Sequence, residues 1–160
     1  MARTLILLRH AKSARPQETP DAARPLAGRG RRDAPAVGRW LRERAPKIDL
    51  VVCSPAVRAV QTWDLVAAQL DAVPQVRHNK WLYGASAHDL LTATQELPHK
   101  ASTAVLVGHN PGLEDFLTLL TGVAEPLKTS AIAVITTPGS WEQARPGSWT
   151  LTALATPRGR

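Results

Sequence analysis

Several residue types are scarce in this sequence, and each scarcity excludes a class of protein. Among 160 residues there is one cysteine, one methionine, one tyrosine and one phenylalanine, and aromatic residues make up 4%. With Cys53 alone, no disulfide can form within the chain, which excludes a disulfide-stapled domain. The few aromatics, and the lack of a zinc-finger or RNA-recognition signature, argue against nucleic acid as a partner.

Long apolar runs are missing as well. The first apolar stretch, residues 4–8, ends at the charged Arg9 and is too short for a signal peptide or a membrane span. Val51 and Val52 next to Cys53 predict a buried thiol, which suits a reducing compartment. We therefore expect a cytoplasmic protein with no membrane partner.

The remaining composition is that of an ordinary globular chain. Hydrophobic residues make up 44% and charged residues 21%, and the length is typical of one domain. We expect a single domain over residues 1–155 and a flexible tail over residues 156–160. The net charge of +7 comes mostly from arginines between residues 24 and 44. This charge fits either an anionic partner or solvated helix faces in an arginine-rich composition.

Apolar runs alternate with segments of helical spacing. Strong runs at residues 4–8, 49–53 and 103–107 predict strands buried on both faces, and weaker strands are predicted at 75–78, 131–136 and 148–154. Helices are predicted at residues 34–44, 54–70, 87–97 and 111–122. This alternation predicts an α/β fold, a three-layer α/β/α sandwich with a mostly parallel central sheet.

Prolines and small polar residues predict the helix boundaries. Pro35 lacks an amide donor, so the first helix should begin or kink there. Ser54 and Asn110 are each followed by proline, a pattern typical of an N-cap and first helical residue. Gly122 is expected to end the last helix.

Each strong strand is followed by basic or hydroxyl-bearing residues that can bind an anion. Arg9 and His10 follow the first strand, Ser54 and Arg58 the second, and His109 the third. Because parallel strands end at one edge of a sheet, these side chains should form a cationic pocket suited to phosphate. Surrounding cations would keep His10 neutral and nucleophilic. No pattern typical of a metal site is present, so we expect neither metal nor cofactor.

Three motifs resemble those of a known family. LILLRHAKSA at 5–14, CSPAVRAVQT at 53–62 and VLVGHNPGLE at 105–114 resemble the core motifs of the histidine phosphatase superfamily. The RHAKS form is similar to the SixA-type phosphohistidine phosphatase branch. The resemblance implies a phosphatase that forms a covalent phosphohistidine at His10 and releases inorganic phosphate. It further implies that Arg9, Arg58 and His109 bind the phosphoryl group and that Ser13 assists.

The general acid of related branches has no counterpart here. Asn110 stands where the acid phosphatase branch has aspartate, and residues 81–83 offer no glutamate like that of the mutase-like branch. An alkoxide leaving group needs such a donor, whereas imidazole leaves more readily. This absence favours phosphohistidine on a protein as the substrate. If a phosphoester were preferred, Glu114 would be the first candidate acid.

Two other functions stay open. The chain could act on a small phosphorylated metabolite or nucleotide, with Lys12, Arg24 or Arg29 contacting a second anionic group. It could also be a phospho-binding module without turnover. The short chain leaves little room for a segment that encloses a small substrate, which favours a phosphorylated protein as partner.

Overall fold

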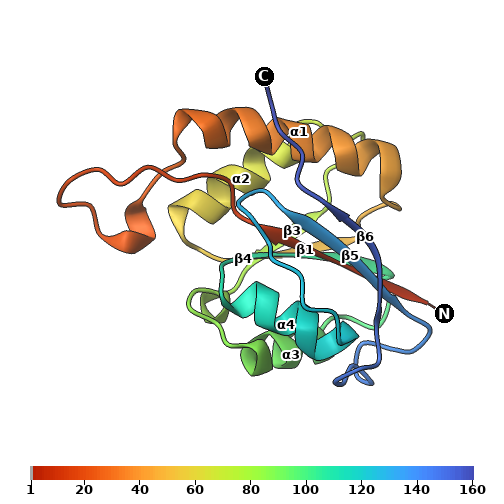
Figure 1. Ribbon diagram of the computed structural model, residues 1–160. Helices are drawn as coiled ribbons and strands as arrows, with labels where there is room; N and C mark the ends of the chain where they lie inside the picture. Colours follow the sequence, from red (N-terminus) through yellow and green to blue (C-terminus); the bar gives the residue numbers. More distant parts are fainter. Residues whose placement is uncertain (1) are drawn as a thin grey trace.

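The computed structural model describes residues 2–160, which form a six-stranded sheet between two pairs of helices (Figure 1). In the sheet order β3-β2-β4-β1-β5-β6, the first four strands are mutually parallel, while β5 is antiparallel to β1 and β6 to β5. The predicted α/β/α sandwich with a mostly parallel sheet is confirmed. The strands are β1 (Arg3–Arg9), β2 (Leu50–Cys53), β3 (Gln75–His78), β4 (Thr103–Gly108), β5 (Ile132–Thr137) and β6 (Thr150–Ala155).

One helix pair covers each face of the sheet. Helices α1 (Gly28–Arg44) and α2 (Val57–Ala67) pack together on one face, and α3 (Ala87–Gln95) and α4 (Gly112–Thr121) on the other (Figure 1). In β1, Leu5 and Leu7 face the core under α3 and α4, while Ile6 and Leu8 face the core under α1 and α2. Each such buried side chain contributes about 1.5–3 kcal/mol. Burial on both faces explains why this strand is a continuous apolar run.

Helix α1 begins earlier than Pro35, so the predicted start was wrong. It begins at Gly28 and includes Pro35 in its interior. Proline in a helix interior costs about 3 kcal/mol because it removes a hydrogen bond and crowds the preceding turn. Tertiary contacts outweigh this cost, since Gly30 packs against the Lys12 carbonyl and Asp33 is buried among hydrogen-bond donors.

The two predicted N-caps were also wrong. Helix α2 has Ala56 as its N-cap and α4 has Pro111, and neither cap uses a side-chain hydrogen bond. Ser54 and Asn110 lie just before the helices. The Ser54 hydroxyl accepts from the Ala56 amide and contacts His109, and the Asn110 side chain donates to the Leu127 carbonyl. Gly122 ends α4 as expected, with a φ of 75° in the left-handed region that favours glycine.

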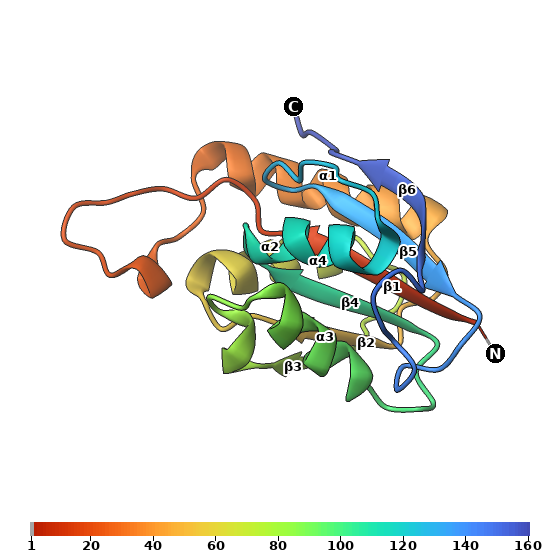
Figure 2. The same ribbon diagram turned by 60° about the horizontal axis from the view of Figure 1, so that its bottom comes forward.

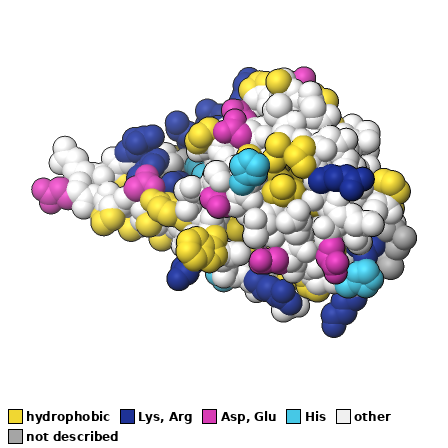
Figure 3. Space-filling view, turned by 90° about the horizontal axis from the view of Figure 1, so that it is seen from below, with side chains coloured by type: hydrophobic (Ala, Val, Ile, Leu, Met, Phe, Trp, Pro, Cys, Tyr) yellow, Lys and Arg dark blue, Asp and Glu magenta, His cyan; other side chains and the backbone are white. Residues whose placement is uncertain are grey.

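The segment between β1 and α1 projects from the body as a long loop (Figure 2). A short 3₁₀ helix, η1 (Asp21–Ala23), lies within it. The base of this loop is closed by backbone bonds from Ala14 to Pro25 (2.8 Å) and from Ala27 to Lys12 (2.9 Å). Figure 3 shows Lys and Arg side chains gathered around that base.

Two residues of the predicted tail, Arg158 and Gly159, contact α1. The Arg158 guanidinium and the Gly159 amide each lie 2.9 Å from the Asp33 carboxylate, which ties this end of the chain to α1.

Cys53, at the end of β2, is fully buried, as predicted. Among the helices of residues 2–160, none is long and apolar enough to cross a bilayer.

Candidate active site

One pocket lies at the edge of the sheet where β1, β2 and β4 end. The parallel pairing of these strands brings the ends of distant segments together, and the first turn of α2 adds Arg58. Seven residues predicted from the sequence line this pocket, joined by Arg15, Asn110 and Thr129: Arg9, His10, Lys12, Ser13, Arg24, Arg58 and His109. Ser54, Arg29 and Glu114, also named from the sequence, do not line it.

The ring of His10 is held in one orientation. Its Nδ1 lies 2.8 Å from the carbonyl oxygen of Ala11. A carbonyl can only accept, so Nδ1 holds the proton and Nε2 keeps a lone pair for attack on phosphorus. The Ala11 amide in turn donates to the Thr62 hydroxyl at 2.9 Å, and that hydroxyl donates to the Arg58 carbonyl at 2.7 Å. This buried chain of bonds fixes the His10 ring relative to α2.

Burial keeps His10 neutral. The ring is 8% exposed, and desolvation is the main reason that its pKa falls to about 3, with His109, Arg58 and Arg9 lowering it further. The sequence argument named the cations as the cause, and the structure shows that burial has the larger effect. A neutral imidazole near pH 7 is the form that can attack.

His109 faces His10 across the pocket. The ring centroids are 5.1 Å apart, and Nε2 of His109 lies 2.7 Å from the Ser54 hydroxyl. That hydroxyl accepts from the Ala56 amide at 3.2 Å, so its own proton is available to His109. Nδ1 of His109 then holds a proton and has no partner among the described residues. Burial and the Arg58 charge lower the pKa of His109 to about 4.

The Arg9 side chain is held in place by the loop that contains Leu127. Its guanidinium donates to the Leu127 carbonyl at 2.9 Å, and its buried Nε has no partner among residues 2–160. Burial lowers its pKa, and the nearby charge of Glu114 opposes this shift. Glu114 itself accepts from the Leu127 amide at 2.7 Å and does not line the pocket. Glu114 therefore supports the loop that holds Arg9.

The open donors of the pocket suit an oxyanion. Arg9 Nε and His109 Nδ1 are buried donors without partners in the described chain, and buried donors normally have one. A phosphoryl group bound beside the Nε2 atom of His10 would supply acceptor oxygens to both and to Arg58. In residues 2–160, no group of three or more His, Cys, Asp or Glu side chains is arranged to hold a metal ion.

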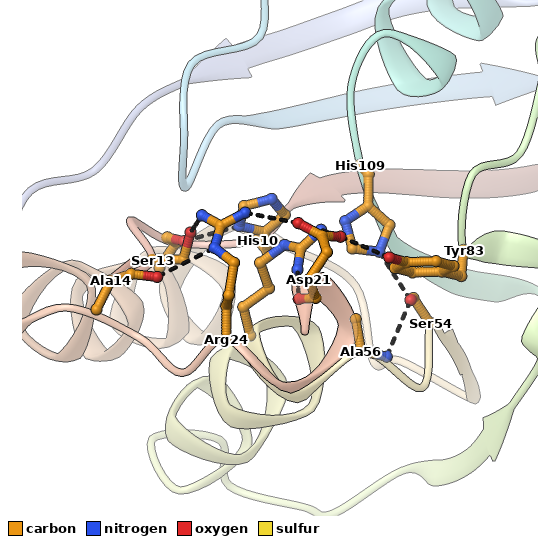
Figure 4. A network of polar contacts seen from close by, with 11 residues as sticks. His10, Ser13, Ala14, Asp21, Arg24, Ser54, Ala56, Tyr83 and His109 are labelled. Atoms are coloured by element: carbon orange, nitrogen blue, oxygen red, sulfur yellow. Dashed lines mark hydrogen bonds and ion pairs between the residues drawn. The ribbon is translucent and has the colours of Figure 1, made fainter. Parts of the chain in front are cut away.

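Asp21, which sequence analysis missed, lies on η1 and contacts two arginines of this pocket (Figure 4). Its Oδ2 accepts from Arg58 at 3.0 Å and from the Tyr83 hydroxyl at 2.5 Å, and its Oδ1 accepts from Arg24 at 2.8 Å. These bonds, first that of Tyr83 and then those of the arginines, hold the pKa of this carboxyl well below its usual range. The one available signal was its position three residues before Arg24.

Tyr83, also missed as a site residue, follows the 3₁₀ helix η2 (Lys80–Leu82). Its ring stands edge-on to that of His109, with centroids 5.6 Å apart, and is 39% exposed. The side chain therefore connects Asp21 to the outer side of the histidine pair.

Comparisons with known proteins agree with this geometry. A family model of the histidine phosphatase superfamily, branch 1, matches residues 5–83. A solved structure from Nakamurella multipartitia, provisionally named phosphohistidine phosphatase SixA, superimposes with a TM-score of 0.85 at 32% identity, covering 98% of this chain and 97% of that one. The chain belongs to the histidine phosphatase superfamily. This histidine phosphatase groups with the SixA-type branch, as its motifs predicted.

Two further relatives extend the likeness. The protein histidine phosphatase SixA complexed with tungstate shares the fold, with a TM-score of 0.83 and 23% identity over 96% of this chain and 97% of that one. An uncharacterised protein of Mycobacterium tuberculosis is 36% identical over 162 residues, covering 94% of this chain and all of its own length. As a phosphatase, the enzyme takes a phosphorylated substrate and releases phosphate.

Proposed function

We propose that this histidine phosphatase hydrolyses phosphohistidine on a protein, with His10 as the nucleophile. The observation that supports this substrate is that, within residues 2–160, no acid near the pocket is placed to protonate a leaving group. Asp21 is held as a carboxylate, and Glu114 bonds the Leu127 amide. The Asn110 amide group donates to the Leu127 carbonyl at 2.7 Å. Phosphoesters would forgo general-acid catalysis of about 10²–10⁴-fold, whereas imidazole departs without that help.

In the first step, Nε2 of His10 forms a bond to phosphorus while the bond from phosphorus to the substrate imidazole breaks. That bond's electron pair returns to the substrate nitrogen, and a ring protonated on its other nitrogen leaves as neutral imidazole. His10 keeps its Nδ1 proton, and the Ala11 carbonyl stabilises the cationic phosphorylated ring through their 2.8 Å contact. Arg9, Arg58 and His109 bind the oxygens of the transferring group.

In the second step, water attacks phosphorus and the bond to His10 breaks. Nε2 recovers its electron pair, so the ring is again neutral, and dihydrogen phosphate leaves with both protons of the water. No proton has to be stored on the protein. This balance suits a site in which burial disfavours charged histidine.

The surroundings of the pocket also support a protein substrate. All four helices lie on the faces of the sheet, and the pocket lies at its edge (Figure 1). A small-molecule substrate with a second anionic group would need free cations nearby. Arg24 is engaged by Ser13, Ala14 and Asp21, and Arg29 by Asp33. Those contacts withdraw two of the three cations named for the small-metabolite alternative, whereas Lys12 lines the pocket and stays available to a second anionic group.

A comparison of substrates tests the proposal. We expect kcat/KM for a histidine-phosphorylated protein domain to exceed that for sugar phosphates and nucleotides by at least about tenfold, because the ratio reports differential transition-state stabilisation. The same domain phosphorylated on serine is the matched control, because it offers the same protein surface for docking but has no imidazole leaving group. A sugar phosphate or nucleotide that is the better substrate would overturn the assignment.

A further inference from the structure

The carboxylate of Asp21 has acceptor capacity that its neighbours leave unused. A carboxylate offers about four lone-pair positions. Three side-chain donors contact it: Arg58, Arg24 and the Tyr83 hydroxyl. Two of them share Oδ2, so the open position belongs to Oδ1. The side chain is 52% exposed, whereas that of Arg58 beneath it is 8% exposed.

This carboxylate lies on the outer side of the phosphoryl site. Figure 4 shows it between Arg24 and Tyr83, beside His10 and His109. Attacking and leaving groups on phosphorus lie roughly in line. A group that leaves opposite Nε2 of the largely buried His10 therefore departs toward solvent, the side on which Asp21 is exposed.

We propose that Asp21 is a specificity-determining residue whose free carboxylate lone pair accepts the ring N–H of the phosphorylated imidazole of the substrate. This inference rests on the proposed function, because the donor that it invokes is the ring N–H of a phosphorylated imidazole. A sugar or serine leaving group has no N–H to place there. Asp21 thus selects for phosphohistidine at the leaving-group side of the reaction.

The charge balance of the pocket gives this contact its importance. The phosphorylated ring leaves as neutral imidazole only if its other nitrogen holds a proton, and a protonated ring is a cation. Lys12, Arg15 and Arg24 line the pocket and would disfavour that cation. Asp21 is the counter-charge, held ionised by donors from the loop, from α2 and from Tyr83. It stabilises the form of the ring from which the phosphorus–nitrogen bond breaks.

The step is balanced without a further reactant. The proton that Asp21 binds stays on the substrate ring throughout, and the electron pair of the broken bond returns to the other ring nitrogen. Asp21 neither gains nor loses a proton. Its role differs from that of a general acid, which its carboxylate form cannot fill.

Asp21→Asn tests this role with two substrates. Against a histidine-phosphorylated protein domain, kcat/KM should fall by about tenfold or more, an effect of order 1.4 kcal/mol. 4-Nitrophenyl phosphate has no ring N–H, so against it the same variant should lose only what a less firmly held Arg58 costs, and the loss should be clearly smaller than with phosphohistidine. Asp71→Asn removes the same charge at an exposed position after α2 and should leave both values unchanged.

The pH profile separates recognition from positioning. In the wild-type enzyme the Asp21 carboxylate should raise the pKa of the bound phosphorylated ring, so the ring keeps its proton to higher pH. In Asp21→Asn that pKa should fall, and phosphohistidine turnover should therefore decline at a lower pH than in wild type. Equal losses on both substrates with an unshifted profile would show that Asp21 only positions Arg58, and would overturn the inference alone. Wild-type enzyme that hydrolyses the aryl phosphate and ignores phosphohistidine would instead overturn the proposed function.

Discussion

The Ser54 hydroxyl lies 2.7 Å from Nε2 of His109 and so links the end of β2 to the end of β4 beneath the pocket. This bond determines which ring nitrogen of His109 is left to present a proton to the pocket. Removal of the hydroxyl leaves Nε2 buried without its partner. The cost of such an unpaired buried group is about 1–3 kcal/mol.

Ser54→Ala should therefore lower kcat/KM by about tenfold or more, as expected for loss of a buried hydrogen bond. Because the proton of His109 can then lie on either nitrogen, the affinity for tungstate should fall as well. Steady-state kinetics and an anion titration measure both effects. An unchanged anion affinity alongside reduced turnover would contradict the positioning role.

His10→Asn should abolish turnover, because the amide has no lone pair on nitrogen with which to attack phosphorus. Rapid acid-free quenching followed by mass spectrometry should detect a phosphorylated peptide containing His10 in wild type and none in the variant. Circular dichroism controls for folding. A phosphoryl adduct on another residue would overturn the mechanism.

Tungstate or phosphate should raise the melting temperature, since ligand that binds only the folded state stabilises it by about 2.7 kcal/mol at a hundredfold excess over Kd. Arg58→Ala should lose most of this stabilisation, because Arg58 is 7% exposed and presents its guanidinium to the pocket. Arg77→Ala, an exposed arginine on β3, is the matched control. Equal anion stabilisation in wild type and Arg58→Ala would place the anion elsewhere.

Stability should decrease as the pH falls from about 6.5 to about 4.5. The unfolded histidines protonate near pH 6.5, whereas the folded pKa values of His10 and His109 are about 3 and about 4. Through this window the unfolded state binds more protons, which costs about 1.4 kcal/mol per pH unit for each histidine. Denaturant unfolding in chloride buffers measures the slope.

A matched pair of variants assigns that slope. His10→Asn should reduce it by about half, since one of the two buried histidines is removed. His88→Asn changes an exposed histidine of α3 and should leave the slope as in wild type. Identical slopes in wild type and His10→Asn would show that other groups set the pH dependence.

The parts of this molecule that the sequence predicted are those determined by local pattern. Strand β1 is buried on both faces, so its residues must be apolar without alternation, and such a run is visible in the sequence. His10 and His109 directly follow strands, so the parallel sheet alone was enough to bring them together. These features depend on the strand order and not on the loops.

What the sequence did not predict depends on contacts between distant segments. Asp21 and Tyr83 are 62 positions apart and meet because η1, within the projecting loop, packs against α2. The early start of α1 depends on Asp33 meeting Arg158 and Gly159. The low pKa of His10 was expected from neighbouring cations, but desolvation, which requires knowledge of the packing, is the larger cause.

The burial of Cys53 has a consequence for oxidative inactivation. Desolvation, with Asp64 as a second cause, raises the pKa of this thiol to about 12, and its Sγ contacts the Ser54 carbonyl at 3.3 Å. Peroxide and alkylating agents attack thiolates, and this sulfur is neither ionised nor accessible. With imidazole as its nucleophile, as we propose, the phosphatase thus offers such reagents no target at its reacting centre, and hydrogen peroxide should leave its activity intact.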